Sequence, residues 1–126
     1  DITRQGFPFY GDNITYKFKA VAENRKFDIY ASWYRGAMIS VKVDGEEKGS
    51  IIYPPYILGV DGLSDGEHDV EMTLYTHRYN TFGPLHLVNE AEPWHGPDAW
   101  RSKKCNWSNE YVLRRVGILT APKINN

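Results

Sequence analysis

Strict alternation of apolar and polar residues is the strongest constraint that this sequence places on its fold. In residues 14–20 (ITYKFKA) every second side chain is apolar, and a β-strand sends successive side chains to opposite faces. Residues 27–33 and 37–43 repeat the pattern. We therefore expect three strands, each with one buried face. The apolar sets of the second and third runs are Phe27, Ile29, Ala31 and Trp33, then Ala37, Ile39, Val41 and Val43.

Turn residues separate these runs and favour antiparallel pairing. Asp44-Gly45 lies between two strand-like runs and predicts a tight hairpin, because both central positions of such a turn need positive φ. A return strand is expected over residues 49–53, ended by Pro54-Pro55, which cannot donate ladder hydrogen bonds. Further strands are expected through Val70, Met72 and Leu74, after a turn at residues 64–67, and over residues 111–119.

Short strands, tight turns and aromatic side chains together favour a β-sandwich. No stretch keeps a helical apolar period long enough for a helix. The 126-residue chain holds four Trp, nine Tyr and five Phe, together with 11 Gly and seven Pro, a composition typical of all-β domains. We expect a single domain over residues 1–126, an all-β jelly-roll sandwich.

The charge and cysteine content argue against several classes of partner. Fifteen basic and sixteen acidic residues give a formal net charge of -1 without a block of like charge, so no nucleic-acid partner is expected. No apolar run approaches the roughly 20 residues of a membrane span, so no membrane partner is expected. The single Cys105 cannot form an internal disulfide and is expected to be a small buried hydrophobe. The start at Asp1 suggests a processed chain or a domain cut from a longer protein.

One irregular region interrupts the predicted strands. Residues 87–108, here called the Trp-rich loop, hold three of the four tryptophans. A loop of this length inside a compact domain is usually functional or disordered, and three tryptophans argue against disorder. We therefore expect function in this loop. The preceding stretch, residues 75–86 (YTHRYNTFGPLH), is expected to end a core strand and launch the loop, because Gly83-Pro84 directs the chain out of the sheet.

The order of the motifs resembles that of a known family of modules. The segment AMISVKVDGEEKGSIIYPPYILGVDGLSDGEHDVEMTLYTHRYNTFGP is similar to the galactose-binding-like β-sandwich modules appended to large bacterial glycoside hydrolases of the alpha-L-rhamnosidase-like and beta-galactosidase-like types. The Trp-rich loop is the part that the resemblance leaves out. The matching features are the Asp44-Gly45 turn, a strand starting at Gly49, Pro55-Tyr56, the turn Asp65-Gly66-Glu67 and the segment NTFGP at residues 80–84.

The resemblance carries implications for fold and role. It implies a galactose-binding-like sandwich that acts as a non-catalytic accessory module beside the catalytic domain of its parent chain. The parent protein would be a bacterial polysaccharide-degrading glycoside hydrolase, secreted or periplasmic. Because a fold hosts many functions, the resemblance by itself assigns no activity.

Catalytic and metal-binding alternatives have weaker support in the sequence. Glu90, Glu92 and Asp98 lie in one loop, but nothing presents them as the flanking carboxyl pair that glycosidases need. The spacing of the four histidines matches no zinc pattern. We therefore expect no catalytic residue, no metal-ligand set and no cofactor, while a structural calcium held by loop oxygens stays open. The histidines are His68, His77, His86 and His95.

Carbohydrate binding is the hypothesis that the Trp-rich loop favours. A sugar ring has an apolar C–H face and a rim of hydroxyls, which suits an aromatic platform surrounded by hydrogen-bonding side chains. The alternative is that the tryptophans pack against the parent catalytic domain and shape its cleft, without independent sugar binding. The expected ligand-binding residues are Trp94, Trp100 and Trp107, the interleaved His95, Asp98 and Arg101, and Arg78 at the end of the preceding strand.

Overall fold

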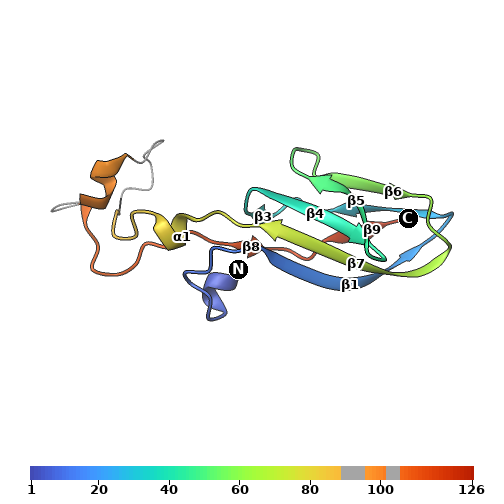
Figure 1. Cartoon of the computed structure of the whole chain (residues 1–126), viewed down its shortest axis with the longest axis horizontal. Coiled ribbons are helices and arrows are strands. Elements are labelled where there is room, and N and C mark those ends of the chain that lie inside the picture. The colour runs from blue at the N-terminus through green and yellow to red at the C-terminus, as the bar shows by residue number, and fades with distance from the viewer. Residues whose placement is uncertain (89–95, 102–105) are drawn as a thin grey trace.

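A computed structural model shows an all-β chain built from short antiparallel strands, as the alternation predicts (Figure 1). It describes residues 1–88, 96–101 and 106–126. No helix within these ranges is long and apolar enough to cross a membrane. The strands are β1 (Ile14–Ala22), β2 (Lys26–Tyr30), β3 (Tyr34–Arg35), β4 (Met38–Val43), β5 (Glu46–Ile51), β6 (Ile57–Asp61), β7 (Gly66–Tyr75), β8 (Gly117–Ile118) and β9 (Lys123–Asn125). The helical turns are η1 (Ile2–Arg4), α1 (Tyr79–Phe82) and η2 (Pro97–Arg101).

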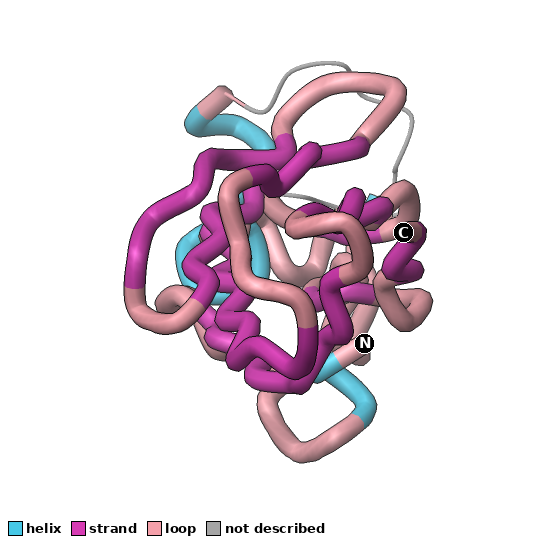
Figure 2. The backbone as a smooth tube through the Cα atoms, turned by 90° about the vertical axis from the view of Figure 1, so that its right-hand side faces the viewer, coloured by secondary structure: helices cyan, strands magenta, loops and turns pink. Residues whose placement is uncertain are grey.

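Two antiparallel sheets pack against each other and form the sandwich. One has four strands in the order β1-β7-β4-β5, and the other has three in the order β6-β2-β9. The view along the strands shows them arranged around a common interior (Figure 2). Apolar side chains from both sheets fill that interior, which is why the alternating sequence selects this fold. Fully buried examples are Phe27, Ile29 and Val60 from the smaller sheet and Ile39, Met72 and Leu74 from the larger one.

Strand β7 shows how the alternation is used. His68, Val70, Met72 and Leu74 point into the core, as the sequence pattern predicts. The opposite face is solvated and carries cross-strand ion pairs with β1, which are Lys17–Glu71 and Lys19–Glu67. One face of β7 therefore supplies the core and the other supplies solubility.

The Asp-Gly hairpin is confirmed, with a small correction to the strand that follows it. Asp44 and Gly45 have φ values of 51° and 82°, the left-handed geometry that such a turn requires. Strand β5 starts at Glu46 rather than at Gly49, because Val43 already pairs with Glu46 across the turn. The return strand therefore begins as soon as the turn ends.

The prediction that Trp33 points inward is wrong. The residue is 53% exposed, because β2 ends at Tyr30 and the chain then crosses to the separate pair β3-β8. Ala31 keeps its buried position, and its N–H donates to the Tyr56 carbonyl oxygen at 3.0 Å. The alternation in the sequence therefore continues for three residues beyond the end of β2.

Most of the predicted closing strand, residues 111–119, is not a strand either. Pairing is limited to β8, and β9 follows after Pro122, a strand that the sequence pattern did not indicate. The backbone before β8 finds other partners. The Asn80 side chain bonds the backbone of Arg114, and the Val116 carbonyl oxygen accepts from the Ile2 N–H at 2.9 Å.

Between β7 and β8 the chain leaves the sandwich and projects as an arm (Figure 1). We define the arm as residues 79–115; it contains α1, the Trp-rich loop and η2. The short pair β3-β8 lies at the end of the sandwich from which the arm extends. The described part of the Trp-rich loop, where we expected function, therefore lies away from the main body of the sandwich.

Candidate functional site

Backbone pairing closes the base of the Trp-rich loop. The Val88 N–H donates to the Asn106 carbonyl oxygen at 3.0 Å, and the Ser108 N–H donates to the His86 carbonyl oxygen at 2.9 Å. Leu87, which lies between these bonds and bridges to Trp107, is 4% exposed. The two ends of the loop are therefore held side by side by a buried apolar residue and a short antiparallel ladder.

Helix α1 forms the start of the arm. Its residue Asn80 is 1% exposed and bonds the backbone of Arg114 on the returning segment. The Gly83 N–H donates to the Tyr79 carbonyl oxygen at 2.7 Å, and a Cβ at Gly83 would lie 2.4 Å from that same oxygen. A glycine is therefore required where the chain turns from α1 into the loop.

Two tryptophans flank a pocket of about 210 Å³ on the arm. Trp100 is 51% exposed and Trp107 is 43% exposed. The Trp100 Nε1–H donates to the Phe82 carbonyl oxygen at 3.2 Å, and the Trp107 Nε1–H donates to Asn109 Oδ1 at 3.0 Å. Protein acceptors thus fix the orientation of both indoles and leave apolar ring surface in contact with water. The described residues that line the pocket are Gly83, Pro84, Leu85, His86, Ala99, Trp100 and Trp107.

His86 lines this pocket and contacts Trp107. Its ring stacks on Trp107 with centroids 4.3 Å apart and planes 14° from parallel. Its Nδ1–H donates to the Ser108 carbonyl oxygen at 2.8 Å, which fixes the tautomer that places the proton on Nδ1. One face of Trp107 is therefore covered by a positioned imidazole, and the exposed part of the indole faces outward.

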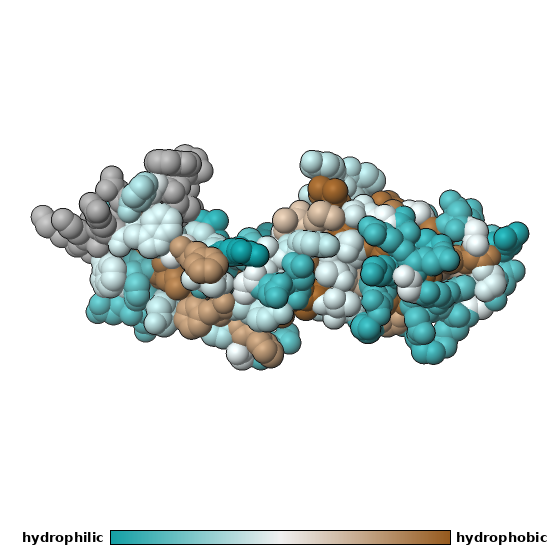
Figure 3. Space-filling model, viewed as in Figure 1, coloured by the Kyte–Doolittle hydropathy of each residue, from teal (hydrophilic) through white to brown (hydrophobic). Residues whose placement is uncertain are grey.

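Further aromatic side chains extend this surface along the arm and the adjoining N-terminal segment (Figure 3). Phe9 and Tyr111 meet edge to face with centroids 5.0 Å apart. Phe82 is 67% exposed and Tyr111 is 58% exposed. Exposed aromatic side chains that gather on one part of a surface are a feature of interaction sites.

The sequence-predicted site residues fall into four groups. Trp100 and Trp107 come together at one pocket. Trp94 and His95 lie outside the described residues. Asp98 and Arg101 belong to η2, next to Trp100, and their side chains are outside the description. Arg78 is exposed at the N-cap of α1 and makes no side-chain capping bond there.

Sequence reasoning missed the supporting residues of the surface. His86 was noticed as part of an unusual stretch, but nothing in its neighbourhood indicated that it stacks on Trp107, 21 residues later. Phe9 lies still further away in the sequence. Both contacts depend on the path of the chain through α1 and back, which local patterns do not encode.

The histidines of the described residues are each bonded to other parts of the chain. No group of three His, Cys, Asp or Glu side chains able to hold a metal occurs among the described residues. His68 is bonded at a turn of the sandwich, while His77 donates to the Arg115 carbonyl oxygen and His86 to that of Ser108. Glu90 and Glu92 lie outside the described residues.

One histidine has a perturbed proton affinity. His68 is buried beside Asp44, and its two ring nitrogens lie 2.6 Å from Asp44 Oδ2 and 2.9 Å from the Ser64 carbonyl oxygen. Both neighbours are acceptors, so the doubly protonated ring satisfies both. The hydrogen bond to Asp44 is the main cause that raises the pKa of His68, followed by the bond to Ser64, and burial opposes them. The pair stabilises the hairpin turn and lies on the sandwich, not on the arm.

Comparison with known proteins identifies a structure with a similar fold. No family model matches the sequence, and no curated protein matches it. A solved structure of a rhamnosidase from Novosphingobium sp. PP1Y is similar, with a TM-score of 0.60 and 17% sequence identity, over 92% of this chain and 11% of that chain. The likeness shows a shared β-rich fold that forms a small part of a much longer glycoside hydrolase chain.

Proposed function

We propose that this chain is a non-catalytic accessory module of a glycoside hydrolase, and that it binds carbohydrate at the aromatic surface of the arm. The observation that carries the proposal is the pocket between Trp100 and Trp107, whose indole N–H groups are bonded to protein while the rings stay about half exposed. Such rings suit stacking against the C–H face of a sugar. The rhamnosidase likeness supports the class of parent enzyme, and the partner catalytic domain follows from it.

Polar groups beside the pocket would supply the hydrogen bonds that orient a sugar. Asn109, Ser108 and the η2 residues Asp98 and Arg101 lie next to the tryptophans in the sequence. One exposed site with few polar contacts supports modest affinity, roughly micromolar to millimolar. The parent protein would be bacterial and secreted or periplasmic, because a polysaccharide too large to cross a membrane must be met outside the cytoplasm.

A second candidate function has its own support. The exposed Phe82 and Tyr111 add apolar surface on the arm beyond the residues that line the pocket. This surface would fit the alternative in which the arm packs against the parent catalytic domain and shapes its cleft. In that case the tryptophans stabilise an interface between domains, and the isolated module binds no sugar.

Calorimetric titration with a panel of neutral oligosaccharides distinguishes the two functions. We expect binding that Trp100→Ala and Trp107→Ala each weaken by at least about tenfold, the loss that follows when one aromatic platform is removed. Trp33→Ala is the matched control, since Trp33 is similarly exposed at 53% but lies on the sandwich. If no saccharide binds while Trp100→Ala still lowers the melting temperature, the carbohydrate-binding proposal is wrong and the interface function replaces it.

A further inference from the structure

The imidazole of His86 has one ring nitrogen without a hydrogen-bond partner among the described residues. Its Nδ1–H donates to the Ser108 carbonyl oxygen at 2.8 Å. A carbonyl oxygen only accepts, so in the neutral ring the proton is on Nδ1 and Nε2 carries a lone pair. The buried side-chain atoms that lack a partner in the described chain are Asp1 Oδ2 and His77 Nδ1. The unpaired Nε2 of His86 is therefore open to solvent.

Three contacts fix the orientation of the His86 ring. The Ser108 N–H donates to the His86 carbonyl oxygen at 2.9 Å, so the two residues are joined through both backbone and side chain. The imidazole stacks on Trp107 with centroids 4.3 Å apart, and its centroid lies 5.2 Å from that of the Tyr111 ring. The ring cannot exchange the positions of its nitrogens without losing the bond from Nδ1. Nε2 is therefore a preorganised acceptor.

The pocket between Trp100 and Trp107, called here the tryptophan pocket, has few other polar side-chain atoms. Its described lining carries them only on His86 and the two indoles. The Trp100 Nε1–H donates to the Phe82 carbonyl oxygen, and the Trp107 Nε1–H donates to Asn109 Oδ1. Since each of these N–H groups is one donor, all three rings have satisfied theirs inside the protein. The described side chains of the lining therefore present ring faces and one acceptor.

A ligand group that meets His86 Nε2 must be a hydrogen-bond donor. A sugar hydroxyl can donate, and the C–H face beside it suits an aromatic ring. The ionised carboxylate of an acidic sugar only accepts, so it would leave the lone pair of Nε2 unpaired when water is displaced. An unpaired polar group of this kind weakens binding. The tryptophan pocket thus favours neutral sugars over acidic ones.

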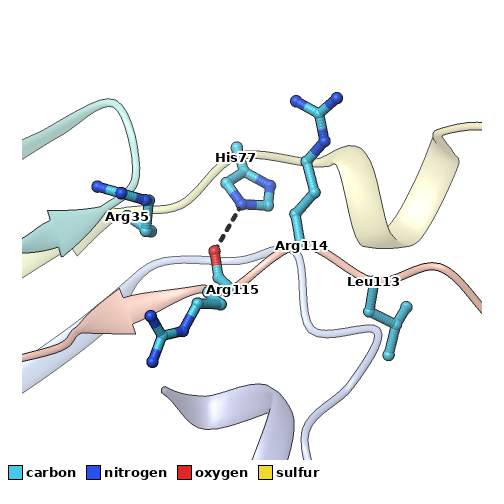
Figure 4. A pocket seen from close by; sticks show the side chains of 5 residues that line it. All are labelled: Arg35, His77, Leu113, Arg114 and Arg115. Atoms are coloured by element: carbon cyan, nitrogen blue, oxygen red, sulfur yellow. Dashed lines mark hydrogen bonds between the residues drawn. The ribbon is translucent and has the colours of Figure 1, made fainter. Parts of the chain in front are cut away.

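A larger pocket on the described chain does not provide a site for acidic groups either. Its volume is about 460 Å³, and the guanidinium groups of its arginines point away from one another (Figure 4). Arg115 Nε lies 3.5 Å from Asp1 Oδ2, and the Arg114 guanidinium stacks on the Tyr79 ring. These arginines therefore do not converge on one carboxylate. The described residues that line this pocket are Arg35, His77, Leu113, Arg114 and Arg115.

We propose that His86 is a specificity-determining residue of the tryptophan pocket, where its Nε2 accepts a hydrogen bond from a hydroxyl group of a neutral sugar ring. The inference rests on the proposed carbohydrate binding and names the class of sugar and the atom that recognises it. The pocket volume of about 210 Å³ is below the roughly 300 Å³ at which sites for drug-sized ligands begin. The pocket therefore suits one sugar ring, which stacks on an exposed indole while one hydroxyl meets Nε2.

The test uses methyl glycosides and their fluorinated derivatives. The methyl glycosides of D-galactose, D-glucose, D-mannose, D-xylose, L-arabinose and L-rhamnose are titrated by NMR, each beside derivatives in which one hydroxyl at a time is replaced by fluorine. Fluorine cannot donate a hydrogen bond. We expect one fluorinated derivative of a sugar that binds to lose at least about tenfold in affinity, because Nε2 then lacks its donor. The methyl glycoside of D-galacturonate should also bind more weakly than that of D-galactose.

Variants of His86 show whether this discrimination depends on Nε2. His86→Phe keeps an aromatic ring beside Trp107 but removes the acceptor. In this variant the parent sugar should lose about tenfold in affinity, and the sensitive fluorinated derivative should bind as well as the parent. His86→Gln returns an acceptor to the side chain and should restore part of the discrimination. A merely structural role would weaken all derivatives alike and leave their affinity ratios unchanged.

His77→Phe is the matched control. His77 also donates to a backbone carbonyl oxygen, that of Arg115 at 3.0 Å, but it lines the larger pocket. The affinity ratios of the fluorinated derivatives should be the same in this variant as in the wild type. Thermal unfolding of each variant checks that it folds.

Nitrogen NMR of the wild-type protein gives a measurement that needs no variant. Saturation with a glycoside that binds should shift the His86 Nε2 resonance, because its lone pair gains a donor. The Nδ1 resonance should move less, since Nδ1 keeps its bond to Ser108. An Nε2 resonance that does not move on binding overturns the inference, whether or not the variants fold.

The outcomes separate this inference from the proposed function. If glycosides bind but His86→Phe leaves the affinity ratios unchanged, the role of His86 is overturned while carbohydrate binding stands. A galacturonate glycoside that binds as tightly as the galactose glycoside overturns it too, because an acceptor at Nε2 would then not select the ligand. If no glycoside binds, both proposals fail. Discrimination that His86→Phe abolishes and His86→Gln partly restores supports both.

Discussion

The side-chain amide of Asn80 makes two hydrogen bonds with the backbone of Arg114: Nδ2 donates to the carbonyl oxygen at 2.7 Å, and Oδ1 accepts from the N–H at 2.8 Å. Asn80 is 1% exposed. One side chain thus takes the place of a neighbouring strand and joins the outgoing and returning segments of the arm. The contact therefore ties together two segments of the arm that are 34 residues apart in the sequence.

Asn80→Ala should lower the free energy of unfolding by about 2 kcal/mol, because it removes two buried hydrogen bonds and leaves the Arg114 backbone unsatisfied. Urea denaturation measures the loss. Asn13→Ala is the control, since Asn13 is exposed and should be nearly neutral. An Asn80→Ala variant as stable as the wild type would show that the amide does not anchor the arm.

Gly83→Ala should destabilise the chain by about 1 to 3 kcal/mol through overpacking. The new Cβ would lie 2.4 Å from the Tyr79 carbonyl oxygen, a backbone atom that α1 cannot move without losing its own hydrogen bond. Gly59→Ala is the matched control, because its Cβ would meet only the flexible Asp28 carboxylate, at 3.3 Å. Thermal unfolding of the two variants should therefore differ clearly, and equal melting temperatures would contradict this account of the turn.

Trp100→Phe should separate stacking from hydrogen bonding at the tryptophan pocket. Phenylalanine keeps an aromatic face but loses the bond from Nε1 to the Phe82 carbonyl oxygen. We expect a stability loss of at most about 1 kcal/mol and saccharide affinity much closer to wild type than that of Trp100→Ala. Calorimetry and denaturation of the same samples give both quantities. Equal loss of affinity in the two variants would mean that the indole N–H, rather than the ring face, matters.

Stability should depend on pH through the pair formed by His68 and Asp44. The pKa of His68 is raised, mainly by its hydrogen bond to Asp44, so this contribution is complete below about pH 6.5, the unperturbed histidine value, and is lost as pH rises through the raised pKa. The pKa of Asp44 is lowered, mainly by its bond to His68 and then by the Asp69 N–H. Its contribution is present above the usual aspartate value and is lost as pH falls through the lowered pKa.

Asp44→Asn tests that pair without disturbing the turn, because asparagine also tolerates the left-handed backbone found at this position, where φ is 51°. We expect the pKa of His68, followed by NMR, to fall in the variant. The wild-type loss of stability as pH rises above about 6.5 should shrink with it. An unchanged histidine titration would show that Asp44 does not set the proton affinity of His68.

Several parts of the fold could be predicted because they depend on local patterns. The alternation through Val70, Met72 and Leu74 places them in the core, and the burial of these three side chains confirms it. Asp44-Gly45 marks a turn because few residues adopt its backbone angles. The inward position of His68 follows from the same parity. Each inference uses residues that are near one another in the chain.

Other parts failed where the local pattern ran past the end of the element. Trp33 continues the alternation of β2, but the strand stops at Tyr30 and the indole is exposed. Residues 111–119 read as a strand, yet the Arg114 backbone bonds a side chain instead of a neighbouring strand. In both cases apolar and polar residues do alternate, but the described chain provides no neighbouring strand with which they could pair.

The candidate site likewise has features that the local sequence predicts and features that it does not. The Trp-rich loop could be recognised by composition, and Trp100 and Trp107 were named from it. The contact of Phe9 with Tyr111 could not, because the two residues are 102 residues apart and neither lies in a recognisable motif. The stacking of His86 on Trp107 likewise depends on the closure of the loop base.

The sequence by itself determined the all-β class, the inward face of the strands and the loop that carries the aromatic side chains, because these follow from side-chain parity, turn angles and composition. Only the tertiary structure decided which way the chain leaves the sandwich. It also decided the role of Asn80, which is chemically ordinary in the sequence but bonds a backbone segment 34 residues away. That contact joins the outgoing and returning segments of the arm.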